Sequence, residues 1–121
     1  MRCVRHQPVT DRKGAPVKQS RTCPAELTTK LIAGRWKIVI LWYLFQDVKR
    51  FSELRRALAG VTQKVLTQQL REMERDGMIA RKVFAQVPPK VEYSVTPLGL
   101  SLRPVVEAMH QWGKEHTPSA E

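Results

Sequence analysis

Cysteine and histidine are scarce in this sequence. Its 121 residues include two cysteines, Cys3 and Cys23, and three histidines, at positions 6, 110 and 116. Two cysteines cannot make the disulfide framework of a small secreted domain, and they stand at no metal-ligand spacing from the histidines. We therefore expect a fold without disulfides and without a zinc site.

Long hydrophobic runs and catalytic motifs are also missing. No stretch of about 18 apolar residues occurs, and the N-terminus lacks the apolar core of a signal peptide, so we expect a cytoplasmic protein without a membrane partner. No Ser/His/Asp or Cys/His set, phosphate-cradling glycine loop or paired acidic site stands out. The sequence therefore predicts neither an enzyme nor a cofactor, and we interpret His110 and His116 as surface residues.

Positive charge, in contrast, is abundant. The chain carries 21 Lys and Arg against 11 Asp and Glu, a formal net charge of +10. A charge of this size in a small protein favours a polyanionic partner. Nucleic acid is the first candidate, and an acidic membrane surface is the second.

Composition divides the chain into three parts. Residues 1–22 mix Pro, Gly and scattered Lys and Arg with isolated apolar residues, which cannot bury enough surface to offset the entropy of ordering. We expect a disordered basic arm there, one folded domain over residues 23–116 and a C-terminal tail over residues 117–121. The overall hydrophobic share of 42% is enough for the core of one domain.

Apolar spacing predicts a mostly helical domain with a small β-hairpin. A short helix begins after Cys23-Pro24 and ends at Gly34, with an apolar face made by Leu27, Leu31 and Ile32. Trp36–Phe45 is apolar at every position but Lys37, which indicates a helix surrounded by others.

Two further helices lie on either side of the turn Ala59-Gly60-Val61. We expect the first to start at the N-cap Ser52, to turn Leu54 and Leu58 inward and to end near Gly60. Thr62 caps the second, which runs to about Asp76 and is followed by Gly77. On this second helix the inward side is formed by Leu66, Leu70 and Met73.

The hairpin and a last helix complete the domain. Ile79–Ala85 and Val91–Val95 are predicted strands, and the prolines between them end the ladder in an extended tip. Thr96-Pro97 starts a helix that runs to about His116 and is expected to kink at Pro104.

This order of elements is that of a winged helix-turn-helix. The exposed stripe of the second helix contains no acidic residue and offers phosphate contacts and base-edge donors from Thr62, Gln63, Lys64, Thr67, Gln68 and Arg71. A solvated helix face is the alternative interpretation of such a stripe. With a basic chain and a hairpin following, we predict a recognition helix that binds double-stranded DNA.

Basic residues of the hairpin are candidates for further DNA contacts. Arg81, Lys82 and Lys90 flank the proline tip, from which they can reach phosphates or the minor groove. Ordinary solubilising charge is the alternative for each of them.

The last helix carries an apolar seam. Its residues follow at spacings of 4, 3, 4 and 3 and are Leu98, Leu102, Val105, Met109 and Trp112. Packing within the chain is the alternative, but the helix is too long and too apolar for a small domain to cover. We predict a two-fold homodimer in which the first and last helices form the interface, with contributions from Leu27, Leu31, Leu102, Val105, Met109 and Trp112.

Cys23 is a candidate sensor. It precedes Pro24 at a helix start, with Arg21 two residues away, and both the helix dipole and the cation favour a thiolate. An inert small side chain is the alternative, and Cys3 in the arm is a weaker candidate.

Together these features predict a sequence-specific transcriptional regulator, a repressor rather than an activator. The alternative is a nonspecific nucleic-acid-binding or architectural protein, in which the charge provides affinity without sequence choice. A winged-helix protein-interaction module would need an acidic or apolar recognition face, and this face is neither.

Three segments of the sequence resemble the HxlR-type family of bacterial winged helix-turn-helix regulators over roughly residues 23–113. They are CPAELTTKLIAGRWKIVILWYLF, RFSELRRALAGVTQKVLTQQLREMERDGMIARKVF and VPPKVEYSVTPLGLSLRPVVEAMHQWG. The most specific pieces are GRW at 34–36, RFSEL at 50–54, LTQQLR at 66–71, VEY at 91–93 and TPLG at 96–99.

The resemblance implies a homodimer joined through the first and last helices, a recognition helix at about 62–76 and a wing at about 86–90. Several members of the family use a cysteine just before the first helix to sense oxidants or reactive electrophiles such as quinones and aldehydes. The resemblance therefore implies that role for Cys23, with a small oxidant or electrophile as effector.

Overall fold

The structure is a computed structural model that describes residues 23–118. It divides into two units, one that ends at Ala33 and one that begins at Gly34. The predicted arm over residues 1–22, with Cys3, and the last three residues of the predicted tail lie outside the described residues. In the first unit, helix α1 (Ala25–Ile32) stops before Ala33, whose backbone is extended, and so ends earlier than the expected stop at Gly34.

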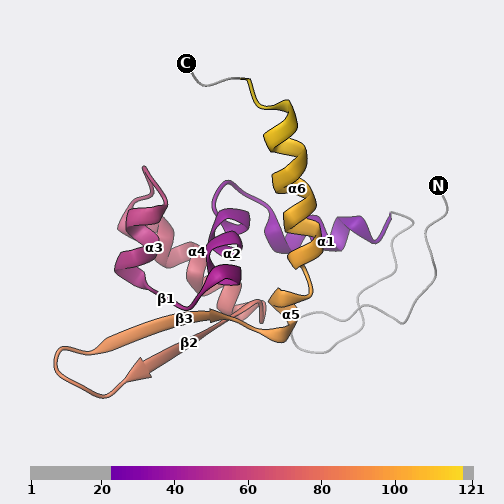
Figure 1. Cartoon of the computed structure of the whole chain (residues 1–121). Helices are drawn as coiled ribbons and strands as arrows, with labels where there is room; N and C mark the ends of the chain where they lie inside the picture. Colours follow the sequence, from indigo (N-terminus) through magenta and orange to yellow (C-terminus); the bar gives the residue numbers. More distant parts are fainter. Residues whose placement is uncertain (1–22, 119–121) are drawn as a thin grey trace. The chain divides into compact units, whose positions relative to one another are not determined.

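The second unit contains the predicted helices and hairpin in the predicted order, with a short additional strand and with the last predicted helix divided in two. It comprises α2 (Lys37–Gln46), β1 (Lys49–Arg50), α3 (Phe51–Ala57), α4 (Gln63–Arg75), β2 (Ile79–Phe84), β3 (Lys90–Val95), α5 (Pro97–Leu100) and α6 (Arg103–His116). The β2–β3 hairpin extends beyond the helices as a long two-stranded ribbon (Figure 1). A mostly helical winged helix-turn-helix is therefore confirmed.

Helix α2 is the centre of the core, as its apolar run predicts. Its side chains Ile40, Leu41 and Leu44 are buried. They share the interior with the inward faces of the other helices, from which the buried residues are Leu54, Leu58, Leu66, Leu70, Met73 and Val106. Since burial of one such side chain stabilises a fold by about 1.5–3 kcal/mol, this core fixes where α3 and α4 lie.

The sheet has a third strand that the sequence did not predict. Its order is β1-β3-β2, with both pairs antiparallel. Strand β1 places Lys49 opposite Tyr93 and Arg50 opposite Glu92, in the segment expected to be only a polar break. Two residues are too few to leave a periodic pattern in a sequence.

The helix-turn-helix is capped at both of its helices. The expected N-cap Ser52 is wrong, because α3 begins at Phe51 and Arg50 occupies the cap, where its backbone N–H donates to Glu53 Oε1 at 2.8 Å. The cap of α4 is as predicted, with Thr62 Oγ1 accepting from the Val65 amide at 3.1 Å. Between the helices Gly60 has φ 90°, a conformation that glycine adopts without strain.

The C-terminal segment contains two helices where the sequence predicted one. Ser101 and Leu102 separate α5 from α6. Pro104 therefore lies in the first turn of α6, where a missing N–H leaves no helical hydrogen bond unmade, and the predicted kink does not form. Thr96 caps α5 as expected, with its Oγ1 accepting from the Gly99 amide at 3.1 Å.

Gly99 allows α5 to lie directly on the sheet. A Cβ at this position would stand 2.7 Å from Val95 Cγ2 and closer still to the carbonyl oxygen of Met78. No larger residue fits without a shift of backbone, which explains a glycine in the segment TPLG.

Candidate DNA-binding surface

Helix α4 presents a polar face to solvent opposite its buried face. The predicted inward residues Leu66, Leu70 and Met73 are buried, as expected. The six predicted contact residues of α4 are exposed, except for Thr67, which is half-buried. A shallow depression follows this face and is lined by Gln63, Lys64, Thr67, Gln68, Arg71, Glu72 and Arg75.

Glu72 contradicts the expectation that this stripe holds no acidic residue. Its Oε1 accepts a hydrogen bond from Lys37 Nζ at 2.8 Å, and the two side chains form an ion pair between α2 and α4. Lys37 is only 7% exposed. The hydrogen bond from Lys37 lowers the pKa of Glu72, against the opposing effect of desolvation by burial. The acidic group is thereby held ionised and paired with a cation.

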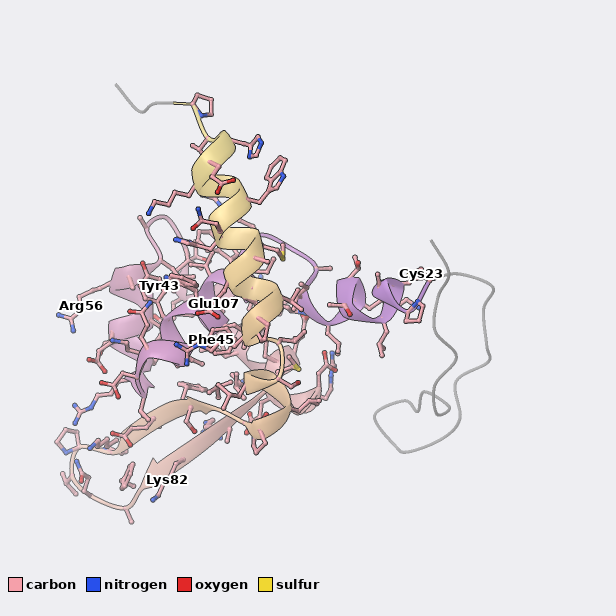
Figure 2. The ribbon with its side chains drawn as sticks, turned by 45° about the vertical axis from the view of Figure 1, so that its right-hand side comes forward. Cys23, Tyr43, Phe45, Arg56, Lys82 and Glu107 are labelled. Carbon is pink, nitrogen blue, oxygen red and sulfur yellow. The ribbon has the colours of Figure 1, made fainter. Side chains whose placement is uncertain are left out.

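Strand alternation places the basic residues of the hairpin on two different faces. Lys82 and Lys90 share one face, where their Nζ atoms lie 4.9 and 4.8 Å from the ring centroid of Phe84. Lys90 also forms an ion pair with Glu92 at 3.1 Å. Figure 2 shows Lys82 on the hairpin, away from the helices. Lys82 and Lys90 can therefore contact DNA only from the face of the hairpin that carries Phe84.

Arg81 does not flank the tip. It pairs with Tyr93 midway along the ladder, three residues before Phe84, which pairs with Lys90 next to the tip. There it lines a groove of about 380 Å³ between α4 and the hairpin, to which α4 contributes Gln63, Thr67 and Arg71. Burial raises the pKa of Tyr93, partly offset by the nearby charge of Arg81. The structure thus brings Arg81 to α4, the predicted recognition helix, and places it on the opposite face of the hairpin from Lys82 and Lys90.

Helix α6 leaves most of its predicted seam uncovered. Val106 is 1% exposed and belongs to the core, whereas Val105 is 40%, Met109 43% and Trp112 64% exposed. Leu102 is half-buried. On the adjacent side of α6, His110 stacks on Trp42 of α2 with ring centroids 4.0 Å apart. Within the described part of the second unit, one side of α6 is therefore covered and an apolar side is exposed.

In the first unit the predicted residues lie at or near the surface. Leu27 is exposed and Leu31 is half-buried. Cys23 is exposed immediately before α1, and its carbonyl oxygen accepts from the Glu26 amide at 2.9 Å (Figure 2).

Sequence reasoning missed several charged residues near this surface. Two of them are Lys37 and Glu72, which form the ion pair between α2 and α4, and the available signal for Lys37 was its place as the single polar residue in WKIVILWYLF. Arg55 and Arg56, on α3, are exposed as well, and Figure 2 shows Arg56 pointing away from the protein. Two consecutive arginines in the first helix of a helix-turn-helix were the signal for that pair.

Two kinds of feature are absent from residues 23–118. No helix is long and apolar enough to cross a membrane. No group of three or more His, Cys, Asp or Glu side chains is placed to hold a metal ion.

Known proteins show the same sequence pattern and fold. The HTH-type transcriptional regulator YdeP of Bacillus subtilis (strain 168) is 50% identical over 94 residues, which are 78% of this chain and 73% of YdeP. The solved structure of the redox regulator HypR in its oxidised form has 45% identity and a TM-score of 0.77, covering 80% of this chain and 100% of HypR. Its reduced form has 47% identity and a TM-score of 0.74, covering 76% and 91%.

The family assignment rests on most of the folded chain. The HxlR-like helix-turn-helix family matches residues 31–121, which include both helices of the helix-turn-helix, the hairpin and α6. The protein therefore belongs to the HxlR-like helix-turn-helix family and is a DNA-binding transcriptional regulator of that type.

Proposed function

We propose that this regulator is a homodimeric repressor that binds a pseudo-palindromic operator and releases it when Cys23 reacts with an oxidant or electrophile. Each subunit places α4 in the major groove of one half-site, with half-sites about one helical turn apart. In this proposal Thr62, Gln63, Lys64, Thr67, Gln68 and Arg71 contact bases and phosphates, while Arg81, Lys82 and Lys90 contact the backbone.

The observation that carries the proposal is the exposed face of α4. It combines two amides, Gln63 and Gln68, with the cations Lys64 and Arg71 along one depression. Amides and guanidinium groups can bind base edges bidentately, whereas cations alone supply only phosphate contacts. A protein that used charge without sequence choice would not need the amides.

A dimer is supported by the uncovered side of α6. Apolar side chains as exposed as Met109 and Trp112 need a partner surface in a stable regulator. A second copy of the same helix, together with Leu27 and Leu31 of α1, supplies one with matching chemistry. The two-fold axis would then set the spacing of the two recognition helices.

Sensing through Cys23 is supported by its exposure and by the relatives. HypR is described as a redox regulator in both solved forms. This chain matches HypR in sequence and fold, and its Cys23 is exposed just before helix α1. Modification at that point would add bulk or a cross-link to α1 and change the spacing of the recognition helices, which an operator of fixed geometry does not tolerate.

Nonspecific nucleic-acid binding remains the second candidate function, because the net charge of +10 favours it. Both candidates bind DNA with steep salt dependence. Only a regulator of this kind holds one site about 10³-fold or more above the nonspecific background.

Footprinting and gel shifts on the intergenic DNA that flanks the gene test both the sequence specificity of binding and the role of Cys23 as a sensor. We expect one protected two-fold site that is lost on treatment with diamide or a quinone. Cys23→Ser should stay bound under the same treatment, and Cys3→Ser should behave like the wild type. Uniform protection contradicts sequence specificity, and equal release of wild type and Cys23→Ser eliminates Cys23 as the sensor.

A further inference from the structure

A large aromatic side chain lies on the face of the hairpin that contributes nothing to the core. Phe84 is half-buried at the end of β2. It pairs with Lys90 in the ladder, and Lys82 pairs with Glu92, so these four residues share one face. Among the described residues, none on this face of the hairpin is buried, and the buried residues of the two strands lie on the opposite face. Core packing therefore does not explain the phenylalanine.

We propose that Phe84 is a positioning residue, whose ring holds the ammonium groups of Lys82 and Lys90 in place to bind the phosphate backbone of DNA. This inference rests on the part of the proposed function that brings these two lysines to the backbone. It assigns a role to a residue that need not touch DNA itself.

The first step is the contact of two cations with one ring. Lys82 Nζ lies 4.9 Å and Lys90 Nζ 4.8 Å from the ring centroid of Phe84. Both distances are within the range of about 6 Å over which an aromatic face attracts a cation. The lysines come from different strands, Lys82 from β2 and Lys90 from β3, so the ring gathers charge from both sides of the hairpin.

The second step is that the ring leaves the ammonium groups able to bind phosphate. An ammonium group has three N–H donors, and its attraction to a ring is electrostatic and does not require all of them. The Lys82 side chain is exposed on the hairpin (Figure 2). Lys90 Nζ has a second anchor in Glu92 Oε2 at 3.1 Å, and 26% of the Lys90 side chain is still exposed. Since the two cations stand beside one carboxylate, the group keeps a positive charge for a polyanion.

The third step is the gain from holding the lysines before DNA arrives. Fixing one long, flexible side chain on binding lowers affinity by roughly 2- to 12-fold, because rotamer freedom is lost. The ring restricts both lysine chains in the free protein already, so binding loses less. We therefore expect removal of the ring to weaken DNA binding by about fivefold to tenfold.

A double-mutant cycle on DNA of random sequence tests this role, because phosphate contacts do not depend on sequence. Phe84→Leu keeps an apolar side chain but removes the ring, and should weaken binding by about fivefold to tenfold. In the Lys82→Met/Lys90→Met background there is no cation to hold, and Phe84→Leu should change binding by less than about twofold. An equal loss in both backgrounds, or no loss in either, would overturn the proposal.

Two control variants separate the ring from apolar surface in general. Phe84→Tyr keeps an aromatic face and should bind within about twofold of the wild type. Val83→Ala removes apolar surface from the preceding residue, which is 54% exposed and lies on the opposite face, and should also leave binding unchanged. If Phe84→Tyr binds as weakly as Phe84→Leu, or if Val83→Ala does, the loss does not come from the cation contacts and the proposal is wrong.

A measurement on the free protein separates this inference from the proposed function. Protons above an aromatic ring resonate upfield in NMR spectra. The Hε signals of Lys82 and Lys90 should therefore move downfield in Phe84→Leu and stay in place in Phe84→Tyr. Lys114, exposed on α6, is the internal reference and should not move in either variant. Unchanged signals of both hairpin lysines in Phe84→Leu would overturn the inference whatever the protein does with DNA.

The two proposals can fail independently. If the wild type protects no specific site but the cycle on random DNA gives the expected coupling, the regulator proposed above is wrong and the role of Phe84 stands. If one operator is protected and Phe84→Leu binds DNA as the wild type does, the role of Phe84 alone is wrong.

Discussion

The uncovered side of α6 predicts that Met109→Asp converts a dimer to monomers. Complete burial of a methionine stabilises by about 1.5–3 kcal/mol, and 43% of Met109 is still exposed, so the dimer gains about 1 kcal/mol from it in each subunit. An aspartate there also places an unpaired carboxylate against apolar side chains, at a cost of at least about 2 kcal/mol.

Two-fold symmetry doubles both contributions. The total loss is roughly 6 kcal/mol, which raises the dimer dissociation constant about 10⁴-fold. The control is Gln111→Asp, which adds the same charge on the opposite side of α6, about 160° away at 100° per residue. That variant should remain dimeric.

Sedimentation velocity at micromolar concentration measures the outcome directly. The wild type and Gln111→Asp should sediment as dimers and Met109→Asp as monomer, with some aggregate. A monomeric wild type would refute the inference that the open side of α6 is an interface. A dimeric Met109→Asp would place the interface elsewhere.

Three further predictions concern the hairpin, the close contact of α5 and the ion pair on α4. Lys90→Ala should weaken binding to all DNA sequences alike and lower the slope of log K against log salt by about one; an unchanged slope in a salt titration would show that Lys90 contacts no phosphate. Gly99→Ala should lower stability by about 1–3 kcal/mol, because the new Cβ meets Met78 and Val95; thermal or urea unfolding tests this, and an unaltered midpoint would contradict the close approach. Since the pKa of Glu72 is lowered in the folded state, its contribution to stability is present above the ordinary value of 4.5 and is lost as pH falls through the lower folded value. Urea unfolding between pH 6 and about pH 3 should therefore lose more stability in the wild type than in Lys37→Met/Glu72→Leu, and equal losses would show that the pair contributes nothing.

The parts of the fold that sequence predicted are those with local causes. The buried face of α4 follows from a 3.6-residue period, and its start follows from the Thr62 side chain, which bonds to an amide three residues away. Gly60 and Gly77 mark positions of positive φ, and both were placed correctly. None of these features depends on what the rest of the chain does.

The errors come from neighbours that are distant in sequence or from competing local rules. Strand β1 exists because Lys49 and Arg50 pair with residues more than 40 positions later, which no pattern in two residues announces. The expected kink at Pro104 assumed a continuous helix, but the chain turns at Ser101 and Leu102 and begins α6 afresh, so that the proline is at a favourable place.

The basic residues of the hairpin show that a sequence can name candidate residues without showing which of them lie on the same face. Arg81, Lys82 and Lys90 were grouped because they lie near one tip. The period of a strand is two, so Arg81 must point to the opposite face from Lys82, and only the sheet determines which face meets α4. Arg81 lies with Arg71 in the groove, and the two lysines lie around Phe84.

Glu72 is the clearest case in which charge composition and charge placement differ. Counting the charges of the α4 stripe without Glu72 predicts a uniformly basic surface. Counting them with Glu72 predicts a less basic surface. The structure shows that neither count applies, because Lys37, 35 residues away, neutralises the carboxylate through a direct hydrogen bond. The net charge of the proposed DNA-binding surface therefore depends on a residue of the core helix, and substitutions at Lys37 are expected to change that surface as well as the core.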